Sequence, residues 1–143
     1  MYNDYMSYDI EKSVGFLLAK AYQRGFGIFR EQLLPYNITP PQFSLLAFLW
    51  QEDGLSQAEL SERSQIDRTT MGGLVDRLEE EGLVRRDPHP DDRRAYRVCL
   101  TARGKSIEAE LCGLADTATV TMTEKLSGRE VETLRGLLAK LRK

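Results

Sequence analysis

The sequence predicts a mainly α-helical fold that contains one small β-hairpin. Apolar residues recur every three or four positions over most of the chain, as they do along one face of a helix. This periodicity changes only between residues 83 and 100, where two short apolar runs flank a loop rich in Pro, Asp and Arg. The chain has 143 residues, 41% of them apolar, so we expect one domain over residues 1–143 with a substantial core.

Two helices are predicted in the first third of the chain. Over residues 10–34, apolar side chains at steps of three and four describe one face of a long helix. The second helix begins at Thr39, which forms a capping box with Gln42, and Gly54 ends it. Its body, residues 43–50, is nearly all apolar, so we expect it to lie buried.

Two shorter helices follow, separated by a tight turn. Ser56 and Glu59 form a capping box that begins a helix ending near Ser64. Asp67 caps the next helix, and Gly82 is the residue expected to end it in a left-handed conformation.

The hairpin is predicted from residues 83–86 and 96–100, joined by a loop over residues 88–92. Val98 and Leu100 should share one face of the second strand, which places Cys99 on the opposite, partly exposed face.

Two helices complete the chain. Thr101 caps a helix that runs to about Lys125, and Ser127 begins the last helix, with apolar positions over residues 131–141. Together with the first helix, these outer helices carry more apolar positions than a small domain can cover. This excess predicts an obligate dimer.

Composition excludes several classes of protein. No apolar run approaches the roughly 18 residues of a membrane span, and the aromatic and acidic segment over residues 1–9 does not resemble a secretory signal. Cys99 and Cys112 do not make a disulfide framework, so we expect reduced thiols in the cytoplasm. One histidine, no metal spacing, no glycine-rich phosphate loop and no catalytic Ser/His/Asp set argue against an enzyme and predict no cofactor.

The charge distribution indicates a different activity. The net charge is −2, but five of the 14 arginines lie between Arg85 and Arg97. Two helices joined by a tight turn and followed by a basic hairpin are typical of a winged helix-turn-helix. In that arrangement Arg68, Thr69 and Thr70 begin the recognition helix and face base edges in the major groove. The hairpin tip, Arg93–Arg94, would reach the adjacent minor groove. A winged helix that contacts only proteins, without binding DNA, remains the alternative.

Several motifs resemble those of the MarR family of bacterial transcription regulators. They are Leu55–Leu60 (LSQAEL), Ile66–Thr70 (IDRTT), Leu74–Glu79 (LVDRLE), Gly82–Arg86 (GLVRR), Asp91–Ala95 (DDRRA) and Leu100–Gly104 (LTARG). The flanking helices follow the family's layout as well, so the resemblance covers residues 10–143.

The resemblance implies a homodimer whose first, fifth and sixth helices intertwine, bound to a pseudo-palindromic operator. It implies a repressor that is released by a small aromatic or anionic effector, or by oxidation. Arg94 would enter the minor groove, oriented by Asp92. The residues implied to contact phosphates are Arg77, Arg86, Ser56 and Gln57.

Two features depart from the family's pattern. Many relatives carry polar or basic residues where this chain has Gly72–Gly73, and the cysteine that the oxidation-sensing branch uses in the first helix is missing. Gly73 lies four residues beyond Thr69 and therefore on the same side of the recognition helix. We expect its backbone to approach the DNA closely. The alternative is that the glycines accommodate a crowded neighbouring helix.

An effector cavity is expected under the first helix. Phe16 would stack on an aromatic acid and Lys20 would neutralise its carboxylate, with Phe43 and Leu46 on the opposite wall. The alternative is a filled core with Lys20 on the surface.

Overall fold

The computed structural model describes residues 7–143, and residues 1–6 of the N-terminal segment discussed above lie outside it. The helices are α1 (Val14–Leu33), α2 (Pro40–Gln51), α3 (Gln57–Ser64), α4 (Arg68–Glu80), α5 (Ala102–Ser106), α6 (Glu108–Met122) and α7 (Gly128–Leu141). The strands are β1 (Leu55–Ser56), β2 (Val84–Pro88) and β3 (Tyr96–Leu100), and short 3-10 turns span Ile10–Lys12 (η1) and Leu34–Tyr36 (η2). The mainly helical fold with a small sheet is therefore confirmed.

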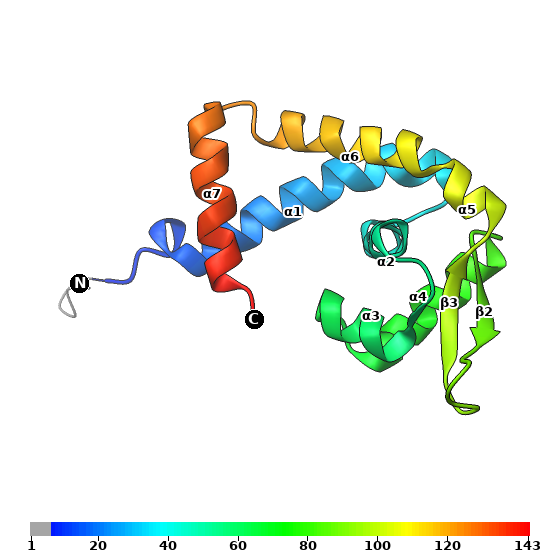
Figure 1. Ribbon diagram of the computed structural model, residues 1–143. Coiled ribbons are helices and arrows are strands. Elements are labelled where there is room, and N and C mark those ends of the chain that lie inside the picture. The colour runs from blue at the N-terminus through cyan, green and yellow to red at the C-terminus, as the bar shows by residue number, and fades with distance from the viewer. Residues whose placement is uncertain (1–6) are drawn as a thin grey trace.

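The molecule has a winged part and a helical arm (Figure 1). Helices α2, α3 and α4 and the sheet form the winged part. Helices α1 and α6 pack against each other and form the arm. Helix α7 crosses the arm at the end far from the sheet.

The sheet has three antiparallel strands in the order β1-β3-β2. The hairpin pairs Val84 with Leu100 and Pro88 with Tyr96, so Pro88 belongs to the strand rather than to the loop predicted for it. Strand β1 was not predicted at all. It pairs Leu55 with Val98 and continues directly into α3, so the wing is joined to the first helix of the helix-turn-helix.

The core lies mainly in the winged part. The fully buried large side chains are Leu33, Leu45, Leu46, Leu49, Leu55, Leu60, Met71, Val75, Leu78, Leu83, Val84 and Leu111. Cys99 is also buried, with 6% of its surface exposed, so the expectation of partial exposure was wrong. The turn that precedes β1 covers this face, since a Cβ placed on Gly54 would lie 4.0 Å from the Cys99 sulfur.

Two helix boundaries differ from the prediction. The helix expected over residues 10–34 begins only at Val14, because Ser13 caps it and accepts a hydrogen bond from the Phe16 N–H at 3.2 Å. The helix expected over residues 101–125 is divided at Ile107 into α5 and α6. A continuous helix would direct the Gly104 carbonyl to residue 108, whereas here it accepts from the indole N–H of Trp50 at 2.9 Å.

The arm and α7 leave large apolar side chains uncovered. In α1, Val14 and Tyr22 are 60% and 67% exposed, and in α7, Leu141 is 66% exposed. Arg24 of α1 donates to the carbonyl oxygen of Met122 at 2.8 Å and so stabilises the C-terminal end of α6.

Candidate nucleic-acid interface

The recognition helix α4 begins with a double hydrogen bond between Asp67 and Thr70. The Thr70 N–H donates to one carboxylate oxygen at 2.8 Å and the Thr70 hydroxyl to the other at 2.9 Å. These bonds favour the charged carboxylate and hold the pKa of Asp67 below its ordinary value. Because Asp67 takes the Thr70 hydroxyl hydrogen, the Thr70 oxygen can only accept a further bond. Arg68 and Thr69 are exposed beside it.

Helix α3 has a complete capping box at its first turn. The Glu59 N–H donates to the Ser56 hydroxyl at 3.1 Å, and the Glu59 carboxylate accepts from the Ser56 N–H at 3.2 Å. These bonds lower the pKa of Glu59. At the other end, Gln65 adopts a left-handed conformation with φ 61°, which forms the tight turn before α4.

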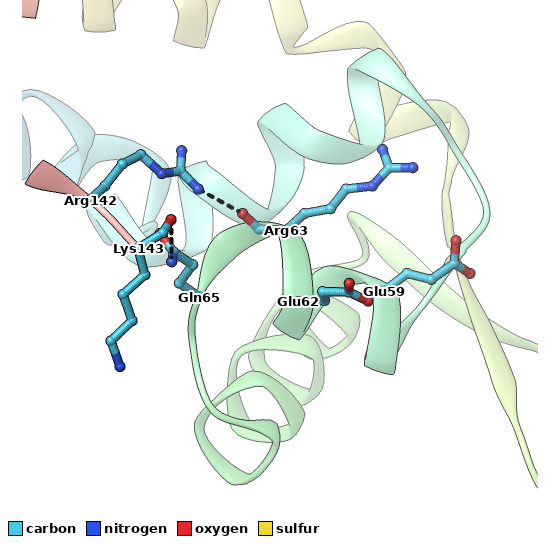
Figure 2. A pocket seen from close by; sticks show the side chains of 6 residues that line it. All are labelled: Glu59, Glu62, Arg63, Gln65, Arg142 and Lys143. Carbon is cyan, nitrogen blue, oxygen red and sulfur yellow. Dashed lines mark hydrogen bonds between the residues drawn. The ribbon is translucent and has the colours of Figure 1, made fainter. Parts of the chain in front are cut away.

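A charged hollow of about 430 Å³ lies between α3 and the C-terminal end of the chain (Figure 2). Arg142 donates to the Arg63 carbonyl oxygen at 3.5 Å, and the Gln65 amide donates to the Lys143 carbonyl oxygen at 2.8 Å. No motif in the sequence indicated this contact, which joins the end of α7 to the turn of the helix-turn-helix.

The wing tip is a hydrogen-bonded turn with two exposed arginines. Asp92 accepts from the backbone N–H of Arg94 at 2.9 Å, and the Ala95 N–H donates to the Asp92 carbonyl oxygen at 3.2 Å. The contact between Asp92 and Arg94 therefore involves the backbone of Arg94. Arg93 and Arg94 form no ion pair with any residue from 7 to 143.

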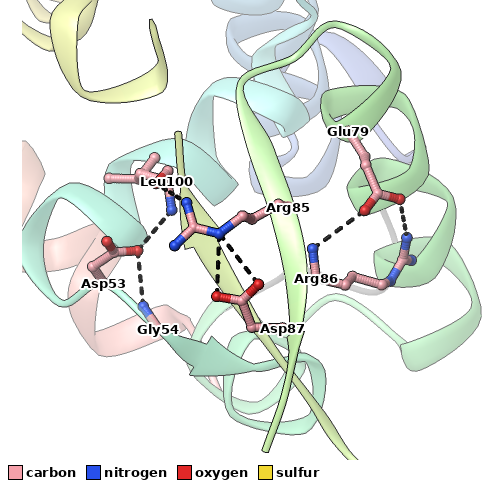
Figure 3. A network of polar contacts seen from close by, with 7 residues as sticks. All are labelled: Asp53, Gly54, Glu79, Arg85, Arg86, Asp87 and Leu100. Carbon is pink, nitrogen blue, oxygen red and sulfur yellow. Dashed lines mark hydrogen bonds and ion pairs between the residues drawn. The ribbon is translucent and has the colours of Figure 1, made fainter. Parts of the chain in front are cut away.

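The other predicted phosphate contacts differ in their surroundings. Arg77 is exposed and lines a hollow of about 550 Å³ between α4, the end of α1 and the start of α2. Arg86 is instead 21% exposed in its side chain and ion-paired with Glu79 of the recognition helix (Figure 3). A second ion pair joins it to Asp76 of the same helix. The guanidinium of the adjacent Arg85 lies 3.1 Å from Asp87.

The two recognition-helix glycines leave space on α4. A Cβ on Gly73 would have no neighbour within 4 Å. One on Gly72 would lie 3.7 Å from the amide nitrogen of Gln57, which is an ordinary contact distance. Crowding by a neighbouring helix therefore does not explain either glycine in this protomer.

The four residues expected to form an effector cavity do not lie together. Lys20 lies over the ring of Phe16, 5.4 Å from its centroid. However, Phe43 packs edge-on against Phe29 at 4.9 Å, and Phe29 lies 13 residues beyond Phe16, or about 20 Å along α1. Leu46 is fully buried in the core.

An apolar cavity of about 490 Å³ lies instead between α1, α6 and α7. Its aromatic lining comes from α1, namely Tyr22, Phe26 and Phe29. Sequence reasoning missed it because the walls come from three helices that are distant in the sequence.

Neither Cys99 nor Cys112 has the lowered thiol pKa of a reactive cysteine. Burial raises the pKa of the Cys99 thiol, and the nearby Asp87 raises it further. Burial also raises the pKa of Cys112, with Glu108 acting in the same direction. Both thiols therefore remain protonated at neutral pH and react slowly.

Within residues 7–143, every helix is too short or too polar to cross a membrane.

Comparison with known proteins identifies this architecture. Residues 38–96 match the model of the MarR family. The repressor NicR of Pseudomonas putida is 40% identical over 104 residues, which are 73% of this chain and 66% of NicR.

Two solved structures extend the similarity to the flanking helices. MarR from E. coli in its apo form is 30% identical, with a TM-score of 0.75 over 92% of this chain and 98% of that chain. BpsR from Bordetella bronchiseptica, whose DNA binding is regulated by 6-hydroxynicotinic acid, is 29% identical. Its TM-score is 0.89 over 95% of this chain and 97% of that chain. The chain therefore belongs to the MarR family and is a DNA-binding transcriptional regulator rather than an enzyme.

Proposed function

We propose that the chain represses transcription by binding a pseudo-palindromic operator as a homodimer in the bacterial cytoplasm. The observation that carries the dimer is the uncovered apolar surface of α1, α6 and α7, which includes Tyr22 and Leu141. Surfaces of this kind are normally covered by a partner. A dimer also supplies the two recognition helices that reading two half-sites about 34 Å apart requires.

Light scattering at micromolar concentration tests the dimer. We expect about twice the 16.3 kDa chain mass. Leu137, which is 54% exposed on α7, should give a monomer when replaced by Glu, because a charge cannot be buried unpaired in such an interface. A wild-type protein that remains monomeric while folded would contradict the proposal.

Within each protomer we assign the major groove to the start of α4 and the minor groove to the wing. Arg68, Thr69 and Thr70 would face base edges, and Gly73 would allow the helix backbone to approach the DNA. Ser56, Gln57 and Arg77 would contact phosphates, and Arg93 and Arg94 would enter the minor groove. The exposure of the arginines at both places supports this assignment.

A mobility shift at low salt with a DNA fragment upstream of the chain's own gene tests DNA binding and operator location together. A winged helix that contacts only proteins would shift no fragment, and family membership argues against that alternative.

We further propose that a small aromatic anion releases the repressor from DNA. The apolar cavity between α1, α6 and α7 has the volume and aromatic lining for one aromatic ring. The regulation of BpsR by 6-hydroxynicotinic acid supports this class of ligand.

Titration of 6-hydroxynicotinate, with salicylate in parallel, should quench Tyr22-dependent fluorescence and weaken the DNA complex. A complex unaffected by both at millimolar concentration would contradict this proposal.

A further inference from the structure

The side chain of Arg86 joins three separate elements at the candidate interface. From β2, its Nε donates to the amide oxygen of Gln57 in α3 at 2.9 Å. Its Nη1 donates to Glu79 at 3.0 Å. Its Nη2 lies 2.8 Å from Asp76 and 3.3 Å from the Gly72 carbonyl oxygen, all on α4. Three of its five N–H groups, on Nε, Nη1 and Nη2, donate hydrogen bonds, and Asp76 is held by the ion pair.

The charges around Arg86 do not favour a phosphate contact. Its single positive charge is paired with two carboxylates, Asp76 and Glu79, so the three side chains together carry a net negative charge. The backbone N–H of Arg86 donates to Glu79 as well, at 3.2 Å, which fixes the strand against the recognition helix. To reach a phosphate, Arg86 would have to give up bonds that it already makes inside the protein.

The bond to Gln57 determines which end of that amide remains free. An amide can present either an acceptor oxygen or a donor NH₂, but arginine has only donors and can bind only the oxygen. Arg86 therefore holds the amide oxygen and leaves the Gln57 NH₂ without a hydrogen bond to any residue from 7 to 143. That NH₂ lies over the recognition helix, 3.7 Å from where a Cβ on Gly72 would sit.

We propose that Arg86 is a positioning residue for DNA binding rather than a phosphate contact. It orients the Gln57 amide as a hydrogen-bond donor to a DNA phosphate oxygen, while it holds β2 against α4. The first helix of a helix-turn-helix crosses the DNA backbone, where the available groups are acceptors, so a fixed donor at the start of α3 suits that surface. This inference rests on the DNA-binding function of the chain.

The salt dependence of DNA binding separates positioning from direct contact. The probe is a fluorescein-labelled 30-base-pair duplex of mixed sequence, titrated with the full chain by fluorescence anisotropy between 25 and 200 mM KCl. Loss of one phosphate contact makes the plot of log association constant against log salt concentration less steep, by about 0.9. We expect Arg86→Lys, which keeps the charge, to weaken binding at least about five-fold with an unchanged slope, because one ammonium group cannot hold both Gln57 and α4.

Gln57→Leu provides a test that is independent of the ion-pair cluster. It should weaken binding by a similar factor without changing the melting temperature, and it should have no further effect when combined with Arg86→Lys. Arg77→Ala serves as the matched control for a direct contact and should lower the slope.

Three results would overturn the proposal. The first is wild-type affinity for Arg86→Lys together with a lowered slope for Arg86→Ala, as a direct phosphate contact predicts. The second is an unchanged affinity for Gln57→Leu. The third is a double variant whose fold-loss of DNA affinity equals the product of the losses in the two single variants. Absence of any binding by the wild-type chain would instead refute DNA binding itself.

Discussion

Replacing Gly104 by Ala should destabilise the protein at the point where the wing joins the arm. Gly104 is buried in α5, and a Cβ there would lie less than 3.0 Å from the Leu83 carbonyl oxygen and 3.3 Å from Leu100 Cδ2. The Leu83 oxygen is fixed because it accepts from the Thr101 N–H at 3.1 Å. The added methyl group can be accommodated only if α5 moves away from the sheet.

The magnitude follows from three contributions. Overpacking of a core position costs about 2 kcal/mol. Loss or stretching of the Thr101 bonds to Leu83 and to the Gly82 carbonyl costs about 1.5 kcal/mol. The higher helix propensity of alanine than of glycine offsets about 1 kcal/mol of this loss in the free energy of unfolding. The net loss is about 2.5 kcal/mol, which for a chain of 143 residues lowers Tm by about 8 °C.

Thermal unfolding followed by circular dichroism measures this loss, at equal protein concentrations because a dimer's Tm depends on concentration. Gly72→Ala is the matched control, since it makes the same change in a helix where the methyl group has only an ordinary 3.7 Å contact. It should raise Tm by a few degrees. A Gly104→Ala protein as stable as wild type would refute the packing argument.

Four further substitutions test the interface and the cap of its recognition helix. Arg94→Ala should weaken operator binding by about 1–3 kcal/mol, measured by anisotropy, and Asp92→Ala should weaken it too because the bond that shapes the wing tip is lost. Tighter binding by Asp92→Ala would show that repulsion of phosphate outweighs this bond. Gly73→Arg should tighten binding to non-specific DNA and steepen its salt slope by about 0.9 for each added phosphate contact; an unchanged slope in a folded variant would place this face away from DNA. Folding lowers the pKa of Asp67, so its stabilising effect is complete above the unfolded pKa and disappears as the pH falls through the folded pKa. Between pH 6 and 3, Tm should therefore fall more steeply for wild type than for Asp67→Asn, and parallel curves would contradict the assignment.

Local chemistry made most of the fold predictable. The caps at Thr39, Ser56, Asp67 and Ser127 are all present, because a cap depends only on residues three positions apart. The break at Ile107 was not predictable in this way, since it accompanies a bond from Trp50, which is 54 residues from Gly104. Burial of Cys99 likewise depends on a turn that is distant in the sequence.

The candidate site was predictable only as a set of residues. Position in the helix-turn-helix motif was enough to identify Arg68, Arg77 and Arg94 as exposed charges. It could not indicate that Arg86 is ion-paired and hydrogen-bonded inside the protein, because its partners come from α3 and α4. Similarly, Phe16 and Phe43 both suit an aromatic ligand, but the length of α1 separates them.

The short strand β1 has a consequence for the operator itself. Because β1 pairs with β3 and leads without a break into α3, the proposed major-groove and minor-groove contacts of one protomer would have a fixed separation. A base pair inserted between these two contacts would displace one of them by about a tenth of a DNA turn, and the protomer has no joint to compensate. An insertion at the centre of the operator would change only the relation between the two protomers of the proposed dimer. Half-sites should therefore be uniform in length, and natural variation in operator length should be confined to the spacer.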